Sequence, residues 1–257
     1  MLLEADLVPF QASALPPGPW LVFAPHADDE TFGMGGTLIQ ARESDIPVSL
    51  VVLTDGSLGG SEDSATVVSV REAEGRAVAS RLGIGTIEFW QEPDRGLVGS
   101  DTLVASMVAV LERASPATVF FPSPMEYHPD HRAAAWAVWR AAGQADFQGA
   151  LWGYEISTYG RINRLVDITR VADEKRMLMA TYYSQVALND YPNKILGLNR
   201  ARTYSLPSEV LYAEGFYDFS EDRGRGFADV VYEMLAPYWQ EGSDGRGGCK
   251  TFRVNRH

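Results

Sequence analysis

Apolar, β-prone runs alternate with stretches of helical periodicity between residues 20 and 156. Five apolar runs are expected to be strands, at 20–26, 48–56, 86–91, 118–124 and 150–156. Four stretches between them are expected to be helices, at 33–44, 66–83, 103–114 and 129–143. Strands that alternate with helices in this order predict parallel β-α-β units. The sequence therefore favours a three-layer α/β/α fold with a mostly parallel sheet.

The pattern is less regular in the last third of the chain. Residues 174–185 and 227–239 have helical periodicity, and residues 209–219 are expected to be extended. Asn193, Asn199 and Arg200 lie in a polar stretch, 193–200, that is expected to be a loop, and contact with the substrate is the less favoured of its two interpretations. The sequence indicates where these segments lie but not how they join the sheet.

Both ends of the chain are expected to be irregular. The first 18 residues end in the Pro- and Gly-rich ALPPGPW, and the Gly-rich residues 241–257 are expected to be a mobile tail. We find no internal repeat and no segment typical of a linker between domains. Residues 1–240 are therefore predicted to form a single domain, with 1–18 as an irregular arm.

The charge balance restricts the class of partner. The chain has 34 acidic and 22 basic residues, for a formal net charge of −12. This composition argues against nucleic-acid binding, which needs a clustered basic surface. It also argues against docking on anionic lipid. The expected partner is a small-molecule substrate.

Cysteine content and hydropathy restrict the compartment and the kind of metal site. Cys249 is the one cysteine, so an internal disulfide framework and a Cys-rich metal site are both excluded. The acidic start MLLEADLVPF lacks the positive region of a secretory signal. No run approaches the ~20 apolar residues that a transmembrane helix needs. A cytoplasmic protein without a transmembrane segment is expected.

Three of the four histidines lie in two short acidic motifs. His26 belongs to PHADDE (25–30), after the first expected strand, whereas His128 and His131 belong to HPDH, after the fourth. Open parallel sheets bind ligands at the carboxyl ends of their strands. If the strand order is the common 3-2-1-4-5, strands one and four are neighbours, and the two motifs meet across one crevice.

The local sequence around these motifs is suited to metal binding. Pro129 is favoured as the first residue of a helix, which places His128 at the helix start and His131 one turn later. In the first motif two consecutive carboxylates point in different directions, so one can bind an ion while the other faces a bound water molecule. His26, Asp29 and His131 would form a shell of two histidines and one carboxylate with an open position, as in catalytic zinc sites.

These motifs resemble those of the LmbE-like/PIG-L family of N-deacetylases. PHADDE is similar to the family signature P-H-P-D-D-E, with Ala27 in place of the second proline, and HPDH matches the second metal motif. Weaker similarities extend over roughly residues 20–220. The resemblance implies a Rossmann-like sheet and a zinc-dependent enzyme that deacetylates an N-acetylglucosamine-type sugar or glycoconjugate. Residues 1–240 would then be a single LmbE-like deacetylase domain.

The resemblance also implies a role for each motif residue. His26, Asp29 and His131 would bind Zn²⁺ or another divalent metal ion. Asp28 would be the general base that acts on the metal-bound water. His128 would stabilise the oxyanion. Asp130 would be a hydrogen-bond partner within the site, and Arg71 would contact the substrate.

Two other functions remain open from the sequence. An amidase with the same catalytic residues would cleave a thiol conjugate or another acyl amine. A Rossmann-type nucleotide-binding protein without hydrolase activity is the alternative of another class. The Gly-rich segment TDGSLGG (54–60) lacks the G-x-G-x-x-G spacing of that class and is interpreted as a flexible loop over the site.

Overall fold

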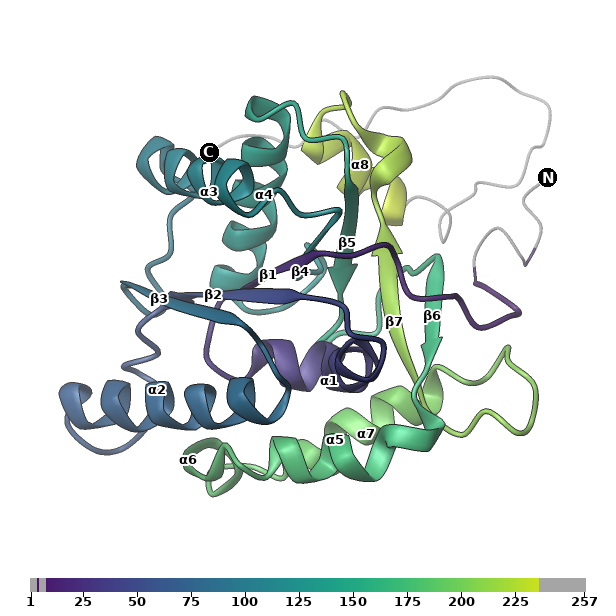
Figure 1. Ribbon diagram of the computed structural model, residues 1–257, viewed down its shortest axis with the longest axis horizontal. Coiled ribbons are helices and arrows are strands. Elements are labelled where there is room, and N and C mark those ends of the chain that lie inside the picture. The colour runs from purple at the N-terminus through teal and green to yellow at the C-terminus, as the bar shows by residue number, and fades with distance from the viewer. Residues whose placement is uncertain (1–3, 5–7, 236–257) are drawn as a thin grey trace, which may run out of the picture.

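The computed structural model describes residue 4 and residues 8–235. Within these residues, seven strands form one sheet in the order β3-β2-β1-β4-β5-β7-β6 (Figure 1). The strands are β1 (Trp20–Ala24), β2 (Val48–Thr54), β3 (Thr86–Glu92), β4 (Thr118–Pro122), β5 (Ala150–Tyr154), β6 (Arg164–Asp167) and β7 (Ala213–Asp218). The first five are parallel, and β7 runs antiparallel to both β5 and β6. The expected order 3-2-1-4-5 and the mostly parallel sheet are confirmed.

Helices cover both faces of this sheet. They are α1 (Asp29–Glu43), α2 (Ser64–Arg81), α3 (Asp101–Ala114), α4 (Pro129–Gln144), α5 (Ala172–Met179), α6 (Tyr183–Val186), α7 (Tyr191–Ala201) and α8 (Phe227–Leu235). Figure 1 shows α3, α4 and α8 on one side and α1, α2, α5 and α7 on the other. The three-layer α/β/α architecture is thus confirmed.

Strand β1 shows how the sequence produces these layers. Successive side chains of a strand point to opposite faces. Accordingly Trp20 and Val22 are buried in the core under α1 and α5, whereas Leu21 and Phe23 are buried in the core under α3 and α4. Because β1 is apolar on both faces, it can occupy only the centre of a covered sheet. Its parallel pairing with β4, with Val22 opposite Phe120, sets two strand ends side by side.

The second half of the chain differs from the prediction in three places. The expected helix 174–185 is two helices, α5 and α6, with a break between Met179 and Tyr183. The stretch expected to be a loop at 193–200 lies inside helix α7, whose start is capped by the Asp190 side chain. Strand β6 was not predicted. These elements depend on tertiary packing, since they are short and largely polar.

Two expectations fall at the ends of the chain. Within the predicted irregular arm, residues 8–18 contain no helix or strand. The predicted tail 241–257 and the end of the predicted helix 227–239 lie outside the described residues. Among the helices that the structure describes, none is long and apolar enough to cross a membrane.

Candidate metal centre

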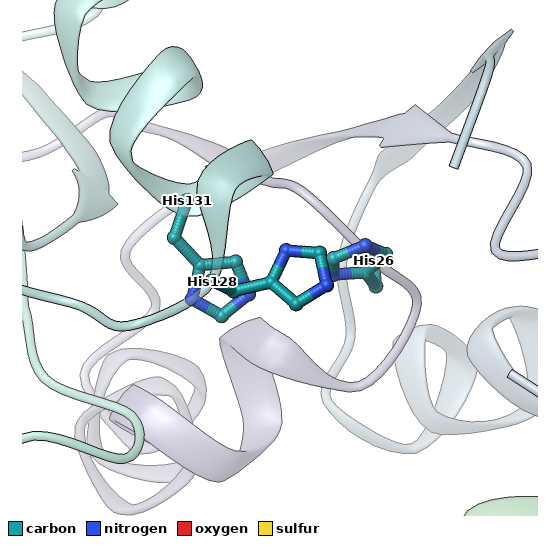
Figure 2. A group of neighbouring side chains, drawn as sticks. All are labelled: His26, His128 and His131. Carbon is teal, nitrogen blue, oxygen red and sulfur yellow. The ribbon is translucent and has the colours of Figure 1, made fainter. Parts of the chain in front are cut away.

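The two histidine motifs meet at the carboxyl edge of the sheet. PHADDE connects β1 to α1, and HPDH begins α4 directly after the loop that follows β4. Figure 2 shows the three imidazole rings gathered at this point, with His131 and His128 from the start of α4 and His26 from the β1–α1 connection. A ring nitrogen from each lies within 4.8 Å of the others. The juxtaposition predicted from the strand order is therefore confirmed.

One carboxylate oxygen of Asp29 lies between two of these rings. Asp29 Oδ2 is 3.1 Å from His26 Nδ1 and 3.2 Å from His131 Nε2, and it also accepts the backbone N–H of His26 at 2.9 Å. All three side chains are buried. The structure thus brings the three predicted metal-binding residues together through one atom of each side chain.

The donor set and its spacing fit a divalent metal. In a tetrahedral site with bonds of about 2.0–2.2 Å, neighbouring ligand atoms lie roughly 3.3–3.6 Å apart. Two of the three separations, 3.1 and 3.2 Å around Asp29 Oδ2, are within a few tenths of an ångström of that range. The ligand-type atoms that all lie within 4.8 Å of one another belong instead to His26, His128 and His131, so the fit of the Asp29 set rests on these two separations and on the chemistry of its donors. Two imidazole nitrogens and a carboxylate are ligands that zinc accepts readily. The residues present therefore fit Zn²⁺ or a similar ion.

The charges of this group are strongly coupled. Burial opposes protonation of His131, but the charge and hydrogen bond of Asp29 and the nearby Glu126 raise its pKa to about 9. Burial likewise opposes protonation of His26, whose carboxylate partners nevertheless hold its pKa well above the usual value. Burial would raise the pKa of Asp29, yet the two histidines hold it well below the usual range. In the metal-free protein the raised pKa values favour the protonated forms of His26 and His131, and a metal ion would displace these protons.

The other ring nitrogen of His26 faces two more carboxylates. His26 Nε2 lies 3.3 Å from Asp130 Oδ2 and 3.3 Å from Asp94 Oδ1. The Asp130 carboxylate is itself fixed, because it accepts the backbone N–H groups of Arg95 at 2.7 Å and of Leu97 at 3.2 Å. Four residues bring a ligand-type atom within 4.8 Å of one another on this side: His26, Asp94, His128 and Asp130. Carboxylates held in this way commonly orient a metal-binding imidazole.

Asp28 lies beside this centre in an unusual backbone conformation. Its φ of 151° is one that residues other than glycine rarely adopt, and such strain is frequent at functional sites. The side chain is 7% exposed, lines a cavity, and contacts Arg71 Nη2 at 3.1 Å. Burial raises the pKa of Asp28 to about 7, against the opposing charge of Arg71. Its carboxyl group is therefore suited to exchanging protons near neutral pH.

His128 occupies the N-terminal cap position of α4. Its Nδ1 accepts the backbone N–H of Asp130 at 3.2 Å, so the proton of the neutral ring is on Nε2. Burial and the neighbouring histidines, His26 and His131, lower the pKa of His128. The side chain is about one-third exposed and lines the same cavity as Asp28. His128 is thus a neutral hydrogen-bond donor toward that cavity.

Arg71 is buried rather than extended into solvent. The side chain is 5% exposed; Nη2 donates to Asp28, Nη1 donates to the carbonyl of Gly56 at 3.2 Å, and Nε has no hydrogen-bond partner among the described residues. A Cβ atom at Gly59 would lie 2.3 Å from Nη1. The glycines of TDGSLGG therefore let this loop pack on the guanidinium, which positions Asp28 and also lines the cavity.

The cavity above these residues has a volume of about 710 Å³. Its polar lining includes Arg71 together with the histidines and three of the acids: His26, His128, His131, Asp28, Asp29 and Asp94. Its walls are largely apolar and are lined by Phe32, Leu58, Ile156, Leu188, Tyr191 and Ile195. A compartment of this size takes a small organic molecule.

Two acidic residues of the site were not predicted from the sequence. Asp94 lies in the PDRGL segment, which is similar to the family but suggested no role. Glu126, whose Oε2 is 3.7 Å from His131 Nδ1, lies outside both motifs. The sequence feature that could have indicated a role for Glu126 is its position after β4, two residues before His128.

Comparison with known proteins agrees with this architecture. Residues 21–142 match the family described as GlcNAc-PI de-N-acetylase, PIG-L. A diacetylchitobiose deacetylase of Thermococcus kodakarensis is 29% identical over 184 residues, which cover 64% of this chain and 69% of that protein. The solved structure of an N,N'-diacetylchitobiose deacetylase from Pyrococcus horikoshii superposes with a TM-score of 0.72 at 24% identity, covering 82% of this chain and 88% of the other.

The same fold also occurs in an enzyme with a different reaction. A 4-carboxy-2-hydroxymuconate hydratase from Pseudomonas putida has a TM-score of 0.67 at 22% identity, covering 81% of this chain and 95% of that one. The fold by itself therefore does not determine the chemistry. The matched residues 21–142 contain both histidine motifs, the whole of α1 and β4, and all but the end residues of β1 and α4. Over these residues the chain matches the PIG-L (LmbE-like) family.

Proposed function

We propose that this protein is a metal-dependent N-deacetylase, with Zn²⁺ as the metal, that acts on an N-acetylglucosamine-type sugar or glycoconjugate. The observation that carries the proposal is the convergence of His26 Nδ1 and His131 Nε2 on Asp29 Oδ2, with the Asp28 carboxyl group next to it. In this proposal His26, Asp29 and His131 hold the ion. When bound, such an ion polarises an amide carbonyl and acidifies water.

Asp28 is assigned the proton transfers. Its carboxylate faces the cavity and is not one of the proposed metal-binding groups, so it is free to accept the proton of the attacking water. Arg71 fixes its orientation through the 3.1 Å contact. General base catalysis of this kind contributes on the order of 10²–10⁴-fold to the rate.

His128 is assigned to the oxyanion. With Nδ1 occupied as an acceptor, its Nε2–H is available to donate to the negatively charged oxygen that forms when the carbonyl is attacked. A neutral imidazole is a good hydrogen-bond donor but a very weak acid. The proton of the departing amine is therefore assigned to Asp28, which has taken one from water.

Asp130 and Arg71 are assigned positioning roles. Asp130 orients His26 through Nε2 and, through its backbone N–H, sets the tautomer of His128. Arg71 holds Asp28 and also lines the cavity, so its guanidinium is in place for the predicted substrate contact.

The sugar substrate is supported by the relatives. The curated relative from Thermococcus kodakarensis is named for deacetylation of diacetylchitobiose, an N-acetylglucosamine disaccharide. An amidase with the same catalytic residues would differ only in the residues that contact the substrate. The apolar cavity walls do not distinguish the two, so the choice rests on these relatives.

The test is amine release by the zinc-loaded protein. The substrates are N-acetylglucosamine, diacetylchitobiose and N-acetylglucosaminyl malate, with N-acetylated amines that lack a sugar as the comparison. We expect release from at least one N-acetyl sugar and little from the others. Release from the non-sugar amides alone would favour the amidase, and metal-loaded protein with no release from any amide would overturn the proposal.

A further inference from the structure

Glu126 is a buried carboxylate that the proposed reaction does not use. It lies in the connection between β4 and α4 and is 1% exposed. Its Oε1 accepts the backbone N–H groups of Ile156 at 2.8 Å, Ser157 at 3.1 Å and Thr158 at 3.2 Å. Its Oε2 accepts the backbone N–H of Ser157 at 3.1 Å and the Ser157 hydroxyl at 2.5 Å. One side chain thus fixes the backbone of residues 156–158.

The same carboxylate faces a ring of the candidate metal centre. Glu126 Oε2 lies 3.7 Å from His131 Nδ1, and this buried nitrogen has no hydrogen-bond partner among the described residues. The other ring nitrogen of His131 faces Asp29. A neutral histidine that offers Nε2 to a metal ion carries its proton on Nδ1, and that proton needs an acceptor. Oε2 becomes that acceptor after an approach of several tenths of an ångström.

We propose that Glu126 is a positioning residue that joins the metal centre to the substrate cavity. It holds His131 in the Nδ1–H tautomer, so that Nε2 is free to bind metal. It also fixes residues 156–158, of which Ile156 and Ser157 line the cavity. This inference rests on the part of the proposed function that assigns His131 to the metal.

The chemistry of the contacts favours this role over a purely structural one. A carboxylate is costly to bury, and the four backbone and hydroxyl donors of residues 156–158 offset that cost. Those donors do not by themselves require that either oxygen lie beside a histidine ring. Yet the oxygen that receives the Ser157 hydroxyl is also the one directed at Nδ1. A shift of loop 156–158 would therefore move the acceptor of the His131 proton.

The experiment compares Glu126→Gln with Ser157→Ala in the full-length chain. Glu126→Gln keeps the size of the side chain but removes the carboxylate that accepts from His131, whereas Ser157→Ala removes one loop contact and leaves the carboxylate. Zinc affinity is measured by competition with a chelator. We expect Glu126→Gln to bind zinc about 10- to 100-fold more weakly and Ser157→Ala to stay within about threefold of the wild type. Amide hydrogen exchange at residues 156–158 should be faster in Glu126→Gln.

A second measurement needs no variant and so does not depend on the stability of Glu126→Gln. In the zinc-loaded wild-type protein, nitrogen-15 NMR of the histidine rings should show a proton on His131 Nδ1. Zinc affinity unchanged in Glu126→Gln, a His131 ring without a proton on Nδ1, or a wild type that binds no zinc would each overturn the inference. Neither readout uses a substrate, so a protein that shows both effects but releases no amine would contradict the deacetylase assignment alone.

Discussion

The backbone N–H of Asp130 donates to Nδ1 of His128 over 3.2 Å, at the first turn of α4. This contact assigns the ring proton to Nε2 and makes neutral His128 the donor toward the cavity. It also gives His128 and Asp28 different proposed roles. A neutral imidazole donates a hydrogen bond but is too weak an acid to transfer its proton to an amine, so that transfer is left to Asp28. The tautomer thus follows from helix capping, since His128 is the cap residue of α4.

The first prediction concerns His128. Replacing it with alanine removes the proposed oxyanion donor but no proposed metal-binding group. We expect kcat to fall by about 10²–10³-fold, as for removal of a single oxyanion donor, with zinc content unchanged. Steady-state kinetics together with metal analysis of the same preparation test this. Loss of zinc from His128→Ala would show instead that His128 binds the ion.

The second prediction concerns the adjacent acids. Asp28→Ala should retain zinc and lose most turnover, by roughly 10²–10⁴-fold, because the proposed base is gone while the proposed ligand Asp29 remains. Asp28→Asn is the matched variant, since it keeps the shape of the side chain at a position with the unusual φ of 151°. An Asp28→Asn protein that is fully active, or one that is empty of metal, would contradict this division of roles.

The third prediction concerns the ligand set. His131→Ala should lose bound zinc, because it removes one of the two imidazole nitrogens next to Asp29 Oδ2. His128→Ala serves as the control, since it removes a histidine from the same cluster without removing a proposed ligand. The measurement is zinc per protein after dialysis against a weak chelator. Full occupancy in His131→Ala would refute the assignment.

The fourth prediction is that zinc affinity rises with pH. In the metal-free protein the pKa of His131 is about 9, above its ordinary value of 6.5. Protonated His131 therefore stabilises the metal-free fold below pH 6.5, and this contribution is lost as the pH rises through about 9. Zinc must displace this proton and that of His26, whose pKa is also raised, so its apparent affinity should increase by up to about tenfold per pH unit for each of the two protons below pH 9. Proton release on zinc addition in weakly buffered solution measures the linkage, and a pH-independent affinity would contradict it.

The sequence was sufficient to predict that the two histidine motifs meet, because local patterns combined with the common strand order 3-2-1-4-5 place them at neighbouring strand ends. Each strand of the parallel half is an apolar run followed by a helix, so the strand order brings the ends of β1 and β4 together. The start of α4 was also predictable, because proline at the first helical position fixes where His128 and His131 lie.

The remaining parts of the site depend on contacts that no local pattern encodes. Glu126 is held near His131 because the β4–α4 connection folds against residues 156–158, which follow β5. Asp94 reaches His26 from the loop after β3, two strands away from β1. Helix α7 was predicted to be a loop because polar residues dominate its sequence, and the buried pair Ile195 and Leu196 is too short to show helical periodicity. In each case the deciding interaction is tertiary.

The last prediction concerns a buried ion pair between α5 and β7. Lys175 Nζ lies 2.7 Å from Glu214 Oε1, and both side chains are fully buried. Glu214 also accepts the backbone N–H groups of Gly36 at 2.8 Å and Thr37 at 2.7 Å, so it ties β7 to α1, the helix that begins at Asp29. Glu214→Ala leaves the Lys175 ammonium buried without its partner and should lower the free energy of unfolding by about 3–5 kcal/mol.

The matched control for Glu214 is Glu43, whose ion pair with Arg170 is at the surface. Glu43→Ala should change the free energy of unfolding far less than Glu214→Ala does, because solvent screens that pair. Urea denaturation of the metal-free proteins measures both changes, which keeps zinc binding out of the comparison. Equal stability of the two variants would mean that the Glu214 carboxylate does not hold α1 to the sheet, and that α1 is positioned by its apolar face alone.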